Sequence, residues 1–224
     1  MYNRRAAPGL RHQARHSVRG AARAEEARPG TSSSVQRIFC RMNLSFRAQA
    51  LRAYVGLGSN LGDRAGNLLL ATRGMMNAGL CVSSLSSIYE TEPVDVLDQP
   101  PFLNMVAELR LDRERGSALP SPEQLLARLL RVEYALGRRR DRWRGPRTID
   151  LDLLFYGGER RATEFLRLPH PRLHERPFVL VPLAELNPDL RHPSLNKTVR
   201  ELLAAVGDTS KVKGWKARIV SGEQ

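Results

Sequence analysis

The chain is organised around one stretch, in which an arginine-rich loop runs into an apolar strand: Arg144-Gly145-Pro146-Arg147-Thr148-Ile149-Asp150-Leu151-Asp152-Leu153-Leu154-Phe155. Side chains alternate between the two faces of a strand, so Asp150 and Asp152 point the same way. Ile149, Leu151 and Leu153 point the other way, into a core. The stretch therefore predicts a strand with a buried apolar face and with two carboxylates side by side on the opposite face.

Two carboxylates on an apolar strand repel each other, and burying them without a cation between them is costly. The local pattern leaves two interpretations at even odds. In the first, a hard divalent ion, Mg²⁺ above all, is held by Asp150 and Asp152 and also contacts substrate phosphates. In the second, both carboxylates pair with arginines in a structural ion network. The arginines just upstream, which would also suit phosphates, are Arg138, Arg139, Arg140, Arg142, Arg144 and Arg147.

Length and composition indicate a globular protein with one sizeable core, since the 224 residues are 42% apolar and 26% charged. No apolar run approaches the roughly 20 residues that a membrane helix needs, so we expect no membrane partner. The only cysteines, Cys40 and Cys81, form no metal motif. A reducing, cytoplasmic setting without a disulfide framework fits best.

The net charge of +13 would suggest a nucleic-acid partner, but its distribution argues against one. Residues 1–50 hold ten arginines and two acidic residues, so they contribute +8 and leave only +5 for the rest of the chain. Much of that remainder lies between Arg138 and Arg147. The basic patch of the body is therefore local, and we expect no nucleic-acid partner.

Residues 1–50 lack periodic apolar residues and are predicted to be a basic disordered extension. Their Arg-rich, Ser-bearing composition also resembles an organellar transit peptide. A third interpretation, slightly favoured, is that the native start is Met42 and that the upstream part is an over-long gene prediction, because the ordered pattern begins just after Met42. The expected organisation is an extension at 1–50, a domain at 51–208 and a loose basic tail at 209–224.

The hydrophobic pattern of the body predicts strand–helix–strand–strand–helix–strand. The expected strands are 53–58, 81–89, 102–111 and one that ends at Tyr156, and the expected helices are 68–76 and one that opens at Ser121 and ends at Gly137. This order is the ferredoxin-like βαββαβ arrangement, an α+β fold with a mainly antiparallel sheet and helices on one face. We expect C-terminal additions, namely a buried apolar segment at 179–186 and a short amphipathic helix at 198–206.

The glycines of the first strand and turn do not form a known nucleotide-binding motif. Gly56, Gly58 and Gly62 give G-x-G-x-x-x-G, which misses the dinucleotide fingerprint by one residue, and no G-x-x-x-x-G-K-[ST] loop occurs. We expect these glycines to permit a tight turn and close packing.

Six motifs follow one another along the chain: Gly56-Leu57-Gly58-Ser59-Asn60-Leu61-Gly62, Tyr89-Glu90-Thr91-Glu92-Pro93, Gln99-Pro100-Pro101-Phe102-Leu103-Asn104, Glu133 with Gly137-Arg138, Gly145-Pro146-Arg147-Thr148-Ile149-Asp150-Leu151-Asp152, and Pro169-His170. Each is weak alone. In this order and spacing, from about Ala53 to Val206, they resemble the 6-hydroxymethyl-7,8-dihydropterin pyrophosphokinase family of the folate pathway.

The resemblance implies an Mg²⁺-dependent diphosphotransferase that moves pyrophosphate from ATP to the hydroxymethyl group of the dihydropterin and leaves AMP. It implies that Asp150 and Asp152 hold two Mg²⁺ ions, which bridge ATP and the pterin hydroxyl. It also assigns Arg138 and Arg147 to the phosphates, where their charge would stabilise the transferring group. No strong protein base is required, since a metal-bound hydroxyl loses its proton more readily.

The resemblance also implies the residues that bind the two substrates. For ATP, the matching positions are Glu133, Arg138, Arg147, His170 and Arg176. For the pterin, the family sandwiches the flat bicycle between two aromatic rings and binds its polar edge, and the matching positions are Thr91, Pro93, Val94, Phe102, Asn104 and Phe178. The implied partners are these two substrates, with dihydropteroate synthase as a functional neighbour, and we expect a monomer.

Three positions depart from the pattern of many relatives. Trp143-Arg144 stands where many relatives have Arg-Trp, so the sequence does not say how these two residues close over the substrate. Phe102 stands where many relatives have Tyr, which keeps the ring and loses a hydroxyl. Phe165 falls where some relatives place a basic ATP contact, so that role is not carried over.

Two rival hypotheses are weaker. An RNA-binding module would share the ferredoxin-like sheet and a basic loop, but the R-G-F/Y-x-F aromatic run that it needs is absent. A catalytically inactive paralogue that still binds a pterin is disfavoured, because both aspartates, Asp150 and Asp152, and both arginines, Arg138 and Arg147, are present.

Overall fold

The structure is a computed structural model, and it describes residues 51–94, 96–110, 120–139 and 145–216. All of these lie in one compact unit, residues 47–224. The expected extension at 1–50 and the pair Trp143-Arg144 lie outside the described residues. The elements are β1 (Arg52–Ser59), α2 (Arg64–Asn77), β2 (Val82–Leu85), β3 (Tyr89–Thr91), β4 (Phe102–Arg110), α3 (Pro122–Ala135), β5 (Asp150–Tyr156), β6 (Arg161–Ala162), β7 (Arg167–Leu168), the 3-10 helix η1 (Leu173–Glu175), α4 (Pro177–Leu186), α5 (Val199–Val206) and β8 (Val212–Gly214).

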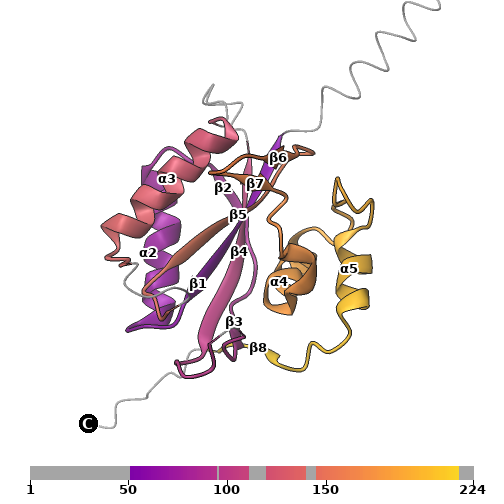
Figure 1. Cartoon of the computed structure of the whole chain (residues 1–224). Helices are drawn as coiled ribbons and strands as arrows, with labels where there is room; N and C mark the ends of the chain where they lie inside the picture. The colour runs from indigo at the N-terminus through magenta and orange to yellow at the C-terminus, as the bar shows by residue number, and fades with distance from the viewer. Residues whose placement is uncertain (1–50, 95, 111–119, 140–144, 217–224) are drawn as a thin grey trace, which may run out of the picture. The chain divides into compact units, whose positions relative to one another are not determined.

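The main sheet has six strands in the order β5-β1-β4-β3-β8, with β2 pairing with β4 as well. Every pairing in it is antiparallel. Helices α2 and α3 cover one face, and α4 and α5 cover the other (Figure 1). The ferredoxin-like prediction is confirmed, whereas the expectation of helices on one face holds only for α2 and α3.

The strand predicted at 81–89 is two strands, β2 and β3, separated by Ser86–Ile88. Both pair with β4, and Ser86 lies between them with its backbone N–H donating to Val106 O at 2.9 Å. The Ser86 hydroxyl in turn accepts from the Val106 N–H at 2.9 Å. The side chain thus takes the place of the backbone carbonyl that would accept this hydrogen bond in a regular strand pair. The prediction of one continuous strand was wrong because a serine can interrupt a ladder without leaving its backbone groups unpaired.

The two core helices begin at side-chain caps. Asp63 accepts from the Gly66 N–H at 2.9 Å and starts α2 four residues before the predicted boundary. The first turn of α2 carries no apolar periodicity, so the pattern alone missed it. Ser121 and Gln124 form a capping box at the start of α3, as its sequence predicted.

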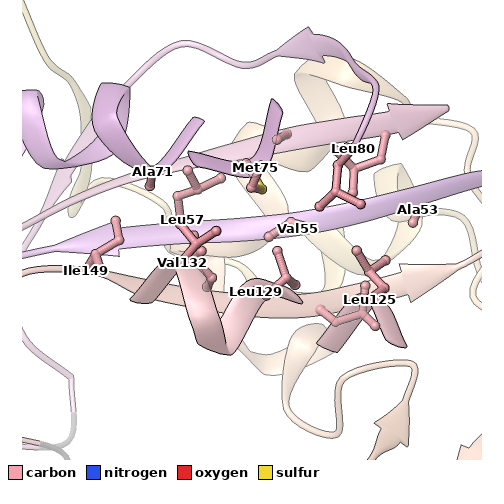
Figure 2. Packing of buried hydrophobic residues seen from close by; sticks show 14 of the residues in the cluster. Ala53, Val55, Leu57, Ala71, Met75, Leu80, Leu125, Leu129, Val132 and Ile149 are labelled. Atoms are coloured by element: carbon pink, nitrogen blue, oxygen red, sulfur yellow. The ribbon is translucent and has the colours of Figure 1, made fainter. Parts of the chain in front are cut away.

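The apolar face of β5 and β1 packs against α2 and α3. Figure 2 shows Ala71 and Met75 of α2 and Leu129 of α3 converging on Val55 and Leu57 of β1. Ile149, Leu151 and Leu153 belong to the same cluster and are at most 4% exposed. This confirms that the face of β5 opposite Asp150 and Asp152 points into a core.

Truncating Leu129, which is fully buried in this cluster, should lower the free energy of unfolding by about 2–5 kcal/mol in Leu129→Ala. The neighbouring Leu130 is 37% exposed, and Leu130→Ala should change stability by less than about 1 kcal/mol. Urea denaturation of both variants gives the comparison. Equal losses in the two variants would contradict the assigned packing.

The C-terminal additions form a second apolar layer on the other face of the sheet. The segment expected to be buried at 179–186 is most of α4, and α5 begins after the cap Thr198. Tyr54 and Phe155 reach this layer from β1 and β5. The expectation of a loose tail from residue 209 was wrong in part, because Val212–Gly214 forms β8 and joins the sheet beside β3.

Among the described residues, no helix has both the length and the apolar character needed to cross a membrane.

Candidate active site

A cavity of about 260 Å³ lies on the α4 side of the sheet, where β1, β4 and β5 meet the loops that follow α3 and β7. It brings together residues that are far apart in the sequence. The predicted site residues that line it are Thr91, Val94, Phe102, Asn104, Arg138, Arg147, Asp150, Asp152, His170, Arg176 and Phe178.

Glycines on the neighbouring strand make room for the two aspartates. Gly58 of β1 lies opposite Asp150, and Gly56 lies opposite Asp152. A Cβ on Gly58 would stand only 3.1 Å from Asn104 Oδ1. These two glycines thus keep the cavity floor open, whereas the expected turn falls at Gly62, which has φ +64°.

Both aspartates are paired with arginines. Asp150 lies 2.5 Å from Arg138 Nη1 and 3.0 Å from Arg147 Nε. Asp152 lies 3.6 Å from Arg176 Nη1, and 40% of its side chain is exposed to the cavity. The ion network that the sequence allowed is therefore present in the structure.

The arginines do not fully neutralise the pair. The pKa of Asp152 is raised to about 7, first by loss of solvent around the carboxyl inside the cavity and next by the nearby Asp150 carboxylate, and Arg176 and Arg147 oppose the rise. A carboxyl group that resists ionisation at neutral pH marks a site with room for more positive charge. A divalent cation would supply that charge.

Among the described residues, no three His, Cys, Asp or Glu side chains gather into a metal site. Asp150 and Asp152 could still hold Mg²⁺, which commonly takes only one or two protein carboxylates and completes its shell with water and phosphate oxygens. The buried hydroxyl of Thr148, two residues before Asp150, has no hydrogen-bond partner in the described part of the chain. The donor set thus fits a hard cation bound together with a phosphorylated substrate.

Two aromatic rings face the same cavity, and each is covered by an arginine. Arg147 Cζ lies 5.1 Å from the Phe102 ring centroid, and Arg176 Cζ lies 5.5 Å from that of Phe178. These are the arginines that pair with Asp150 and Asp152. Each arginine therefore contacts one carboxylate and one ring.

A buried polar pair lies beside Phe102. Asn104 Nδ2 donates to Thr91 Oγ1 at 2.8 Å, and the two residues are 7% and 6% exposed. This bond uses one of the amide hydrogens and fixes the side-chain orientation of Asn104. The rest of the amide remains available to a ligand edge in the cavity.

His170 lines the cavity and is uncharged at neutral pH. Its pKa is lowered to about 4, first by burial and next by the positive charges of Arg176 and Arg172. Its Nδ1 accepts from the Arg172 N–H at 3.3 Å, which leaves Nε2 to carry the proton. A neutral imidazole of this kind can donate a hydrogen bond without adding charge.

Glu133 and Pro93 do not line the cavity. Glu133 is 2% exposed, accepts from the Leu151 N–H at 2.8 Å and lies 3.5 Å from Arg138 Nε. It therefore lies behind Arg138 and fastens α3 to β5. The expectation that Glu133 contacts ATP stays a prediction, and the contacts described here are with Arg138 and Leu151.

Sequence reasoning missed Asn60, which joins three parts of the site. Its N–H donates to Arg147 O at 3.1 Å, and its Oδ1 accepts from the Arg147 N–H at 2.7 Å. Its Nδ2 donates to Gln99 Oε1 at 3.1 Å and to Pro100 O at 3.2 Å. Asn60 is only 2% exposed. The only signal in the sequence was the polar Ser59-Asn60 pair directly after the predicted strand. Such a pair is equally typical of a turn and of a residue that anchors a loop, so the sequence did not distinguish the two.

The family model for 7,8-dihydro-6-hydroxymethylpterin-pyrophosphokinase matches residues 54–188, more than half of the chain. The chain belongs to this family. Proteins named 2-amino-4-hydroxy-6-hydroxymethyldihydropteridine pyrophosphokinase are similar to it over nearly their whole length. That of Bacillus subtilis is 41% identical over 168 residues, which is 74% of this chain and 91% of the relative. That of Methylorubrum extorquens is 46% identical over 154 residues, 68% of this chain and 92% of the relative.

Longer proteins also match part of the chain. The mitochondrial folate synthesis bifunctional protein of Arabidopsis thaliana is 45% identical over 132 residues, which is 59% of this chain and 23% of that protein. A crystal structure of HPPK-DHPS in complex with substrates has a TM-score of 0.55 at 13% identity, over 70% of this chain and 43% of that one. The chain thus spans less than half of this structure, and the likeness confirms the fold.

Membership of the family confirms the activity expected from the motifs. The chain is a pyrophosphokinase, a diphosphotransferase that moves pyrophosphate to hydroxymethyldihydropterin in folate biosynthesis.

Proposed function

We propose that the cavity binds ATP and the dihydropterin side by side, with Asp150 and Asp152 as the ligands of two Mg²⁺ ions. The observation that carries this proposal is the position of the two carboxylates. They lie on one face of β5 in a cavity that is also lined by four arginines and two phenylalanine rings. When bound, Mg²⁺ would neutralise phosphate charge and promote loss of the proton from the pterin hydroxyl.

We expect the arginines to exchange partners when the substrates bind. Arg138 and Arg147 both pair with Asp150. Phosphate oxygens offer the same planar, charge-assisted bonds as a carboxylate. These arginines would therefore move from the aspartate to the phosphates and stabilise the charge that develops during transfer. Arg176 would leave Asp152 for the nucleotide in the same way.

The aromatic rings and the buried amide account for pterin recognition in this proposal. Phe102 and Phe178 would stack on the flat bicycle, which contributes about 0.5–1.5 kcal/mol beyond burial. Asn104, held by Thr91, would bind the polar edge. A ring system lacking that edge would leave buried groups unpaired, and this is the basis of selectivity. Val94 would contact the pterin as well, while Pro93 shapes the loop.

For ATP, the neutral His170 would donate a hydrogen bond. Because its pKa is about 4, nucleotide binding should show no histidine-type step between pH 6 and 7.

The test is the formation of AMP by the purified full chain. We expect AMP from ATP only when hydroxymethyldihydropterin and Mg²⁺ are both present, with one pterin diphosphate formed per AMP. Omitting the pterin or adding excess EDTA serves as the control. Absence of AMP in the complete mixture would refute the activity, and undiminished AMP formation with EDTA would refute the metal assignment.

We further propose that the chain acts as a monomer in the cytoplasm, with dihydropteroate synthase as a functional neighbour. The bifunctional folate synthesis relatives support a link with a second folate-pathway enzyme. Two of the plant relatives are named as mitochondrial, so an organelle is the alternative compartment. Size-exclusion chromatography with light scattering tests the monomer, and localisation of a tagged full chain tests the compartment.

A further inference from the structure

The C-terminal strand β8 lies directly beside β3 at the edge of the main sheet (Figure 1). Val212 pairs with Thr91, and Gly214 pairs with Tyr89. The ladder continues past β8, because the Trp215 N–H donates to Ile88 O at 2.9 Å. The final segment of the described chain is thus built onto the strand that carries Thr91.

Strand β3 has little of its own to hold it in place. It has only three residues, and its other edge pairs with β4, where Tyr89 lies opposite Asn104 and Thr91 lies opposite Phe102. Without β8, β3 would be the edge of the sheet and one row of its backbone groups would lose its partner strand. Short edge strands open more readily than interior ones.

The position of β3 matters for the cavity because of the bond between Thr91 and Asn104. The Thr91 hydroxyl accepts from Asn104 Nδ2 at 2.8 Å, and both side chains are buried. A small displacement of β3 would break this bond and free the amide to rotate. The loop that follows β3 carries Val94, which also lines the cavity.

Trp215, the residue directly after β8, anchors the strand to the hydrophobic core. It is partly buried and packs against the hydrophobic cluster between the sheet and helices α2 and α3, as does Ile88. Strand β8 also contacts α4, the helix that carries Phe178. Lys213 on β8 is exposed. A charged side chain on an outer strand disfavours pairing of that edge with other chains.

We infer that β8 and Trp215 are positioning elements for pterin binding, because they hold β3 and thereby keep the Thr91 hydroxyl on the Asn104 amide. This inference rests on the proposed role of Asn104 at the pterin edge. It assigns a function to residues 209–216, which composition alone marked as a loose basic tail.

The inference predicts a selective loss of pterin affinity. A chain that ends at Asp208 should raise the KM for the pterin about tenfold, since a misplaced buried partner weakens binding by roughly one hydrogen bond. The KM for ATP and kcat should stay within about twofold. A chain that ends at Lys216 is the matched control and should behave like the full chain. Hydrogen exchange of β3 amides should speed up only in the shorter chain.

Point variants keep the test decisive if the shorter chain folds poorly. Trp215→Ala should raise the pterin KM and speed amide exchange in β3, and Trp215→Phe should restore both, because it keeps an aromatic ring in the core. All kinetics are measured well below the melting temperature of each variant.

Three outcomes would overturn the inference. One is an unchanged pterin KM in the chain ending at Asp208 and in Trp215→Ala. Another is a parallel fall in kcat and in affinity for both substrates, which would mean general destabilisation. The third is a full chain that fails to bind the pterin, which would refute the proposed function as well. Normal binding by the full chain and by the shortened chain would refute this inference alone.

Discussion

Replacing Asp152 with asparagine should lower kcat by about a thousandfold or more while leaving the fold intact. The substitution keeps the size and shape of the side chain but removes the negative charge of the carboxylate that we propose as a metal ligand. Loss of a metal that stabilises transition-state charge costs several kcal/mol, and each 1.36 kcal/mol is about a factor of ten in rate. AMP formation at saturating ATP, pterin and Mg²⁺ is the measurement.

The same variant should be at least as stable as the wild type, and the gain should grow with pH. In the metal-free protein, folding raises the pKa of Asp152 from 3.8 to about 7. The folded state therefore binds more protons than the unfolded state between about pH 4 and 7, and stability falls as pH rises through this window. Asp152→Asn removes this dependence. Melting temperatures of both proteins in EDTA, at pH 5 and at pH 8, measure it.

Asp189→Asn is the matched control for both effects. The Asp189 side chain is 77% exposed and pairs with Arg200 on the surface at 3.2 Å. Its replacement should leave kcat unchanged and should shift stability only slightly. Retained turnover in Asp152→Asn would remove the metal assignment. A melting temperature that falls at pH 8 would show that the carboxylate is stabilising in the ion network.

The sequence predicted β5 well because a strand has a period of two residues. Once Ile149, Leu151 and Leu153 are assigned to the core, Asp150 and Asp152 must share the opposite face, as they do. The helices of the core were predicted for a similar reason, since their apolar residues recur at helical spacing. Local periodicity thus fixed the layers and placed the two carboxylates.

Local periodicity does not predict interactions between segments that are far apart in the sequence. Glu133 carries the charge and helix position of a ligand contact, and only the packing of α3 on β5 places it behind Arg138. The segment around Val212 has the composition of a tail and forms a strand only because β3 offers an open edge. In both cases the structural role depends on the neighbouring segment, and the sequence of the residue itself does not determine it.

The site depends on residues that hold its loops in place as well as on residues that bind ligands, and Asn60 is the clearest example of the first kind. Asn60→Ala should lower kcat/KM by about a hundredfold, since it removes the amide that joins Arg147 to the loop at Gln99 and Pro100. Misplacing an oriented group by about 1 Å can change rates by about that factor. Steady-state kinetics with both substrates are the measurement. Asn77→Ala, at an exposed position near the end of α2, is the control and should have no effect.

Asn60→Asp separates the two halves of this anchor. The carboxylate still accepts from the Arg147 N–H, but it cannot donate to Gln99 Oε1 and it faces Pro100 O instead. If Asn60 mainly positions Arg147, Asn60→Asp should keep more activity than Asn60→Ala. If the loop at Gln99 and Pro100 matters more, the aspartate should be the worse variant, because it leaves a buried charge against a carbonyl. Wild-type kinetics in both variants would mean that Arg147 is positioned by Asp150 and Phe102 alone.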